Sequence, residues 1–118
     1  MAAVGIVTVG ATRRQLVVTI VDPNGNIVTL SATLANHALQ GKSTDTPAVT
    51  INVAPTAVDT TGGVLTFDSI GTLVTQANLT SAGVKRSTYN LKVRYTDASA
   101  KLDFTDEFQF IWDHDPLT

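Results

Sequence analysis

The stretch Thr88–Asp113, TYNLKVRYTDASAKLDFTDEFQFIWD, decides the fold that the sequence predicts. Apolar and polar residues alternate through Thr88–Thr96 and again through Leu102–Asp113, as in strands with one buried and one exposed face. The polar segment Asp97–Lys101 between them predicts a turn. Most of the aromatic residues lie in this stretch, so we expect an antiparallel hairpin that anchors the hydrophobic core.

The outward positions of this hairpin carry charges of both signs. If same-face positions on the two strands have an odd residue sum, Arg94 faces Asp103 or Thr105. By the same rule, Lys92 faces Thr105 or Glu107. An exposed pair of opposite charges contributes about 0.2–1 kcal/mol. We therefore interpret these charges as setting the strand register rather than forming a ligand site.

Two positions break the alternation in the second half of the hairpin. Asp106 falls on the inward side between Phe104 and Phe108, whereas Ile111 falls on the polar side. This pattern predicts an exposed edge or a bulge that turns Asp106 outward, or a contact with another subunit at both positions. The candidate interface residues are therefore Asp106, Ile111, Lys92 and Arg94.

Other segments of the chain predict further short strands separated by turns. They are Val4–Val9, Gln15–Val21, Ile27–Leu30, Ala48–Val53 and Val64–Asp68. Gln15–Val21 is apolar at odd and even positions, which indicates a strand covered on both faces or one in the centre of a sandwich. A buried helix is the alternative there, although its β-branched residues favour a strand. Asp22–Asn26 (DPNGN) predicts a turn rather than a calcium loop.

Four connecting segments are less regular. Ser31–Leu39 fits either a strand or one helical turn, and Gln40–Pro47 predicts a polar loop. Ala54–Gly63 predicts a connector that ends in two glycines. Ile70–Leu79 shows helical spacing of its apolar residues and predicts one short helix.

About seven or eight short strands in a chain of 118 residues predict an all-β fold, an antiparallel immunoglobulin-like β-sandwich. A closed barrel is the alternative architecture. The length suits one domain over residues 1–118. We expect residues 1–14 to form an extended arm or a first strand, and residues 113–118 to form a terminal tail.

Composition argues against several classes of function. A formal net charge of −2 and a pI near 5.4 argue against a general nucleic-acid-binding surface. Because the chain has no cysteine, it forms neither disulfides nor thiolate metal sites. No apolar run reaches the roughly 18 residues of a membrane span, and no basic segment precedes the first apolar residues. We expect neither a membrane span nor a signal peptide.

The histidines and carboxylates form no recognisable catalytic or metal motif. His37 and His114 lack the spacing of a zinc site. Asp113–Asp115 could recruit a cation, but adjacent strand residues point apart, which favours a solvated terminus. A hydrolase with paired carboxylates would depend on Asp106 in an apolar pocket, for which the outward bulge is the alternative. We therefore expect no enzyme, no cofactor and no metal, and we assign no catalytic residue.

The aromatic residues offer one alternative function. Trp112, Tyr89 and Tyr95 could form a stacking platform for a sugar ring, which would make the chain a carbohydrate-binding or host-surface adhesin module. Aromatic residues on the inward side of a sandwich strand are more often part of the core. A glycan partner is therefore an alternative rather than the main prediction.

Several segments follow the pattern of a known family. They are Asp22–Asn26 with Ile27–Thr33, Thr61–Phe67, Leu79–Gly83 with Tyr89, Leu91–Tyr95, Asp97–Lys101 and Phe108–Trp112. In order and spacing, the chain resembles the immunoglobulin-like domain at the N-terminus of phage baseplate upper proteins and related tail modules. One departure is that Lys85–Ser87 separate Gly83 from Tyr89 more widely than in the family pattern.

This resemblance implies assembly rather than catalysis. It implies a non-enzymatic structural protein of a bacteriophage virion, with contacts in a tail, baseplate, neck or capsid surface. The implied partners are other virion proteins and copies of the chain itself. The implied location is the virion, after synthesis in the host cytoplasm. No catalytic residue carries over from the family.

Overall fold

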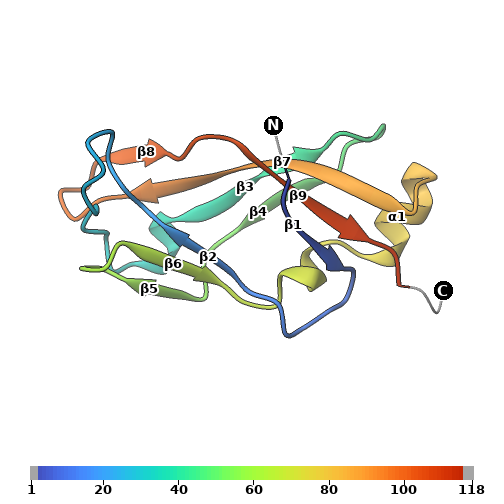
Figure 1. Ribbon diagram of the computed structural model, residues 1–118, viewed down its shortest axis with the longest axis horizontal. Coiled ribbons are helices and arrows are strands. Elements are labelled where there is room, and N and C mark those ends of the chain that lie inside the picture. The colour runs from blue at the N-terminus through green and yellow to red at the C-terminus, as the bar shows by residue number, and fades with distance from the viewer. Residues whose placement is uncertain (1–2, 116–118) are drawn as a thin grey trace.

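The computed structural model describes residues 3–115, which form two β-sheets packed around a shared hydrophobic core (Figure 1). The larger sheet, sheet A, has the strand order β1-β9-β7-β3-β4, with β8 also paired to β7. Its strands are β1 (Ala3–Thr8), β3 (Ala38–Ser43), β4 (Thr50–Val53), β7 (Arg86–Thr96), β8 (Leu102–Phe104) and β9 (Phe108–Asp113). The smaller sheet, sheet B, has the order β2-β6-β5. Its strands are β2 (Leu16–Thr19), β5 (Ala57–Asp59) and β6 (Val64–Phe67).

This strand order is that of an immunoglobulin-like sandwich. In sheet A, the order β9-β7-β3-β4 matches the G-F-C-C′ order of a variable-type domain. In sheet B, the order β2-β6-β5 matches the B-E-D order. The predicted all-β sandwich is confirmed, with nine strands in the described residues rather than seven or eight. One pairing departs from the antiparallel pattern, because β1 runs parallel to β9.

The ends of the chain are partly described. The predicted arm at residues 1–14 contains β1, whose Ile6 lies beside Ile111 of β9, so this strand pairs within its own chain. In the predicted tail, Asp113 is the last residue of β9, and the backbone NH of His114 donates to the carbonyl of Lys85 at 2.8 Å. Residues 116–118 of that tail lie outside the described residues.

Three short helical segments complete the fold: η1 (Leu34–Asn36), η2 (Ile70–Leu73) and α1 (Gln76–Ala82). The helix predicted at Ile70–Leu79 is thus split in two and extends three residues further. In η2, a Cβ at Gly71 would lie 2.5 Å from the carbonyl oxygen of Ala11, so this position requires glycine. No helix among residues 3–115 is long and apolar enough to cross a membrane.

The predicted hairpin anchors the core. Trp112 and Tyr89 are almost fully buried, and their rings pack edge to face with centroids 4.9 Å apart. The ring of Phe110 lies 5.1 Å from that of Trp112. The indole NH of Trp112 donates to the carbonyl of Ile70 at 2.9 Å, which fastens η2 to sheet A. The inward alternation predicted for these aromatic residues is confirmed.

A change of register divides the second half of the hairpin. Tyr89 pairs with Phe110, whereas Arg94 pairs with Phe104, so one extra residue separates β8 from β9. The hydroxyl of Thr105 accepts from the backbone NH of Val93 at 3.0 Å and so holds the interruption against β7. Asp106 lies there and is exposed, as the bulge interpretation predicted.

This interruption also reverses the faces of β8. Phe104 is 45% exposed and Leu102 is 55% exposed. Both residues point away from the core, because their register partners Arg94 and Thr96 occupy outward positions of β7. The prediction that Leu102 and Phe104 face the core is therefore wrong. A shift by one residue moves every side chain of a strand to the opposite face.

Three other predictions are corrected. The segment Gln40–Pro47 is not simply a loop, because Gln40–Ser43 belongs to β3 and pairs with β4 and β7. The connector Ala54–Gly63 contains β5. The strand at Gln15–Val21 is not covered on both faces, because Val17 and Val21 are more than half exposed at the edge of sheet B. The turn at Asp22–Asn26 is confirmed, with Gly25 at φ +83°.

Candidate functional site

Polar side chains cover the outer face of sheet A, the face turned away from sheet B. Alternation along the paired strands turns one set of side chains to this side, since their neighbours in the chain point into the core. The polar members near its centre are Gln40, Lys42, Thr50, Asn52, Asn90, Lys92 and Gln109. This is the face on which amide and ammonium groups of β3 and β7 lie side by side.

A groove of about 710 Å³ crosses this face. Its floor is set by register: Gln40 pairs with Lys92, and Lys42 pairs with Asn90. Phe104 and Glu107, which flank the interruption between β8 and β9, also line it. We call this feature the sheet A groove. The close approach of β3 to β7 depends on Gly41, since a Cβ there would clash with the carbonyl oxygen of Asn90.

The cross-strand ion pairs predicted for Lys92 and Arg94 are not formed among the described residues. Lys92 is exposed and lines the groove together with Glu107, but the two side chains make no ion pair. Arg94 lies between Ala38 and Phe104, and its Nε is buried without a hydrogen-bond partner in the described part of the chain. The register change at β8 explains the failure, because it places Phe104 where the prediction had Asp103 or Thr105.

One ion pair does set a register, at the other end of the hairpin. Arg86 and Asp113 are paired residues of β7 and β9, with Nη2 and Oδ2 3.0 Å apart. Nδ1 of His114 lies 3.0 Å from the other carboxylate oxygen of Asp113. The hydrogen bond from Arg86, followed by the bond to His114, lowers the pKa of Asp113. Hydrogen bonds to a carboxylate stabilise its charged form.

The remaining two candidate interface residues lie apart from the groove. Ile111 is half-buried on the outer face of sheet A, beside Ile6 of β1 and opposite Thr88. Asp106 lines a separate hollow of about 470 Å³ at the end of the sandwich, together with Tyr95 and Asp103. The structure therefore distributes Asp106, Ile111, Lys92 and Arg94 over several places rather than one interface.

Tyr95 lines the hollow beside Asp106 and has a raised pKa. Burial raises the pKa of Tyr95, and the charges of Asp103, Asp97 and Asp22 raise it further. These charges act in the same direction because a phenolate would be repelled by nearby carboxylates. Within residues 3–115, however, no three histidine, aspartate or glutamate side chains are arranged to hold a metal ion.

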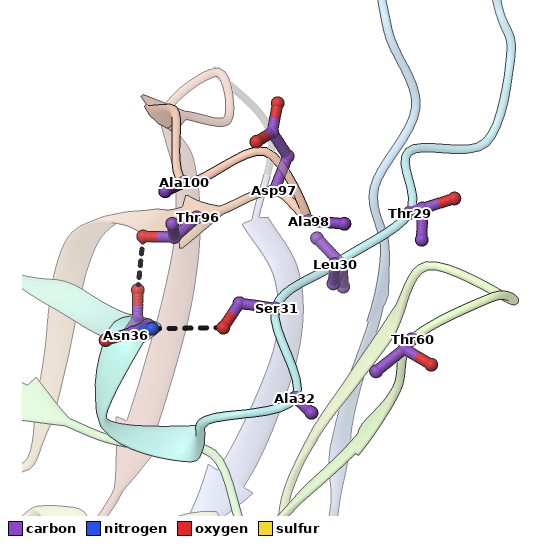
Figure 2. Close-up of a pocket in the computed structure, with 10 residues that line it drawn as sticks. All are labelled: Thr29, Leu30, Ser31, Ala32, Asn36, Thr60, Thr96, Asp97, Ala98 and Ala100. Carbon is purple, nitrogen blue, oxygen red and sulfur yellow. Dashed lines mark hydrogen bonds between the residues drawn. The ribbon is translucent and has the colours of Figure 1, made fainter.

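Another hollow, of about 410 Å³, lies between the segment Thr29–Ala32 and the turn Asp97–Ala100 (Figure 2). Three of its polar residues bind one another: the amide of Asn36 donates to the hydroxyl of Ser31, and the hydroxyl of Thr96 donates to the carbonyl of Asn36, both at 3.0 Å. The hollow therefore marks where this segment joins the two sheets rather than a set of groups aimed at a ligand.

The two histidines are engaged in separate structural contacts. His37 is fully buried, with Nε2 2.8 Å from the carbonyl of Ser31. Its Nδ1 accepts from the backbone NH of Thr96 at 3.2 Å, so the proton of the neutral ring lies on Nε2. His114 is bound to Asp113 near the end of β9. Neither lies beside Asp106, so the groups that a hydrolytic centre would require do not converge.

The predicted sugar platform is absent from the described surface. Trp112, Tyr89 and Tyr95 are all buried, with 1%, 0% and 8% of their surfaces exposed. The exposed aromatic ring of the hairpin is instead Phe104, which the sequence pattern had placed in the core. Gln40 and Lys42 were missed as well, because QGKS offers two small residues and no large apolar one to indicate a strand.

The outer face of sheet B has a different character. Val17, Val21 and Ile27 are 56%, 51% and 56% exposed. Val17 occupies an outward position of the edge strand β2, and Val21 and Ile27 form an isolated bridge just beyond that strand. The signal for this face was present in the sequence as the apolar residues at both odd and even positions of Gln15–Val21.

No protein-family model matches the chain, and no curated protein matches its sequence.

Proposed function

We propose that this chain is a non-enzymatic structural module of a bacteriophage particle. It makes protein–protein contacts in a tail, baseplate, neck or capsid surface, with other virion proteins and with copies of itself. The immunoglobulin-like strand order supports this proposal, as does the resemblance of Asp22–Thr33 and Thr61–Phe67 to phage tail modules.

The observation that carries the proposal is the outer face of sheet B. Val17 lies on that face, Val21 and Ile27 lie in the bridge that follows β2, and each of the three side chains is more than half exposed. Apolar surface gains roughly 25 cal/mol per Å² when it leaves water, so this face is stabilised when a neighbour covers it.

The edges of sheet B offer a second kind of contact. β2 and β5 are the two outer strands of this sheet, and each has one side unpaired within it. Such edges can add a strand from another protein through backbone hydrogen bonds. Val17 lies on β2, so the apolar face and an open edge meet at the same strand.

Two other functions receive less support. A hydrolase would need converging ionisable groups, whereas Asp106, His37 and His114 lie in three separate places. An adhesin that stacks sugars on Trp112 or the tyrosines would need them exposed, and they are buried.

The proposal is tested by tracing a tagged chain through particles purified from a lysate of the source phage. We expect the wild type in the particle fraction, and oligomers of the free chain by mass photometry. The double variant Val17→Asp, Val21→Asp should fold but enter particles at least about tenfold less, since it places two charges in the buried contact. A strictly monomeric wild-type chain that never enters particles would contradict the proposal.

A further inference from the structure

The sheet A groove brings four polar side chains of two strands to one spot. Gln40 and Lys42 of β3 stand opposite Lys92 and Asn90 of β7, and all four point away from the core. The groove volume of about 710 Å³ lies within the range of roughly 300–1,000 Å³ found for small-molecule sites. The floor belongs to two central strands of a sheet, so its groups are held by the most rigid part of the fold.

The two amides have hydrogen-bonding groups left over. Nε2 of Gln40 donates to the side-chain oxygen of Asn52 at 3.2 Å. The side-chain oxygen of Asn90 accepts from Nε2 of Gln109 at 3.0 Å. Among the described residues, the side-chain oxygen Oε1 of Gln40 and the side-chain nitrogen Nδ2 of Asn90 have no hydrogen-bond partner. Gln40 and Asn90 are diagonal neighbours on β3 and β7, so one offers an acceptor and the other a donor to different hydroxyl groups of a ligand, because a hydroxyl both donates and accepts.

The floor is also positively charged. Lys42 and Lys92 are exposed and make no ion pair within residues 3–115. They are diagonal neighbours on adjacent strands, with backbones roughly 7–8 Å apart, so both ammonium groups can reach one anion. Two carboxylates also line the groove: that of Asp45 accepts a hydrogen bond from the hydroxyl of Ser87, and Asp45 lies beyond the end of β3. Glu107 is the other, and it stands outside the floor formed by β3 and β7.

Phe104 supplies an apolar wall to this charged floor. Its ring is 45% exposed because the extra residue before β9 turns β8 outward. A ring placed beside hydroxyl-binding groups can cover the C–H face of a pyranose. Anionic peptides or free phosphate would use the lysines but would have no need of the ring and the amides together.

We propose that the sheet A groove binds an acidic saccharide, a chain of sugar rings that carry carboxylates. Lys42 and Lys92 bind the carboxylates, Gln40 and Asn90 bind hydroxyl groups, and Phe104 packs against a ring face. This role goes beyond assembly and does not depend on it. The groove and the apolar face of sheet B lie on opposite outer faces of the sandwich, so each can be occupied while the other is free.

The test uses the full chain and an oligomer of galacturonic acid, followed by changes in backbone amide NMR signals at low salt. We expect the largest changes at β3 and β7, including Gln40 and Lys92. The methyl ester of the same oligomer, which has the rings but no charge, should bind about tenfold more weakly. An oligoglutamate of equal charge should also bind about tenfold more weakly, because it lacks hydroxyl groups and ring faces.

A matched pair of variants separates the groove from overall charge. Lys42→Gln with Lys92→Gln should weaken binding of the oligomer by about tenfold or more. Lys85→Gln with Lys101→Gln removes the same charge at exposed positions outside the groove lining and should change affinity less than about twofold. Phe104→Ala should weaken binding about threefold. Thermal unfolding of each variant verifies that the fold is kept.

Several outcomes would overturn this inference. Undetectable binding of the acidic oligomer by the wild type would exclude the site. Equal weakening by the two double variants would show attraction to overall charge, and equal binding of oligoglutamate would identify an acidic-peptide surface instead. The assembly proposal has its own readout: the Lys42, Lys92 double variant should still enter particles, whereas the Val17, Val21 double variant should still bind the oligomer.

Discussion

The two faces of the β7–β9 hairpin carry different kinds of side chain. The inward face holds Tyr89, Phe110 and Trp112, whose rings are packed against one another and excluded from water. The outward face holds separate polar and charged groups, such as Asn90 and Lys92, and one exposed ring, Phe104. The difference teaches that the fold depends on the inward face, whereas the outward face can be changed to suit a partner. Substitutions of similar size should therefore have very different effects on the two faces.

The largest effect is expected from matched aromatic truncations. Trp112→Ala should lower the free energy of unfolding by about 3–5 kcal/mol, because it opens a cavity and leaves the carbonyl of Ile70 without its donor. Phe104→Ala should change it by less than about 1 kcal/mol, because the ring is nearly half exposed. Urea unfolding of both variants measures the contrast. Equal losses would show that Phe104 belongs to the core after all.

An intermediate effect on folding stability is expected at alkaline pH. Burial raises the pKa of Tyr89, with a further contribution from Asp45, and burial also raises the pKa of Tyr95. These are the chain's two tyrosines. Because the raised pKa favours the protonated form in the folded state, stability is complete below the tyrosine pKa of the unfolded chain. It is lost as pH rises from that value through the folded pKa.

The measurement is phenolate absorbance and circular dichroism over the same alkaline titration. We expect no phenolate at the ordinary tyrosine pKa, and then ionisation of both residues together with unfolding. A tyrosine that titrates normally while the circular dichroism stays native would contradict the burial of the inward face. Phe104→Ala is the control and should leave both curves unchanged.

The smallest effect is expected at the exposed pair Arg86–Asp113. The pKa of Asp113 is lowered in the folded state, chiefly by Arg86, so its contribution is present above the unfolded pKa. That contribution is lost as pH falls through the folded pKa. Arg86→Gln should therefore lose slightly more stability at neutral pH than in acid. Urea midpoints at the two pH values measure the effect, and a difference that grows in acid would contradict it.

The alternation of apolar and polar residues was enough to predict most of the hairpin. Alternation placed Tyr89, Phe110 and Trp112 inward correctly, because burial of large rings leaves little choice. It failed at Phe104, because a single extra residue between β8 and β9 puts the two strands in opposite phase and has no signal of its own beyond Asp106 on an apolar side. The sandwich itself was predictable from the number of short strands and turns.

The sheet A groove could not be predicted in the same way. Lys92 was recognised as an outward charge, but its neighbours Gln40 and Lys42 lie in a segment that resembles a polar loop. β3 is a strand because it is paired on both sides, and Gly41 permits the close approach, so tertiary contacts rather than local propensity decide its structure. To predict a groove formed by two such strands, the strand register must be known, and a single sequence does not reveal it.

The parallel pairing of β1 with β9 also has a consequence for synthesis. Ile6 is translated before β2 to β8, whereas its partner Ile111 is translated after them. β1 must therefore remain unpaired while β2 to β8 are made, with its backbone groups available to other strands. Topologies with such distant contacts fold slowly, in roughly milliseconds to seconds. Closure of this edge is thus a late event in folding, and a chaperone that shields the first strand should raise the yield of native protein.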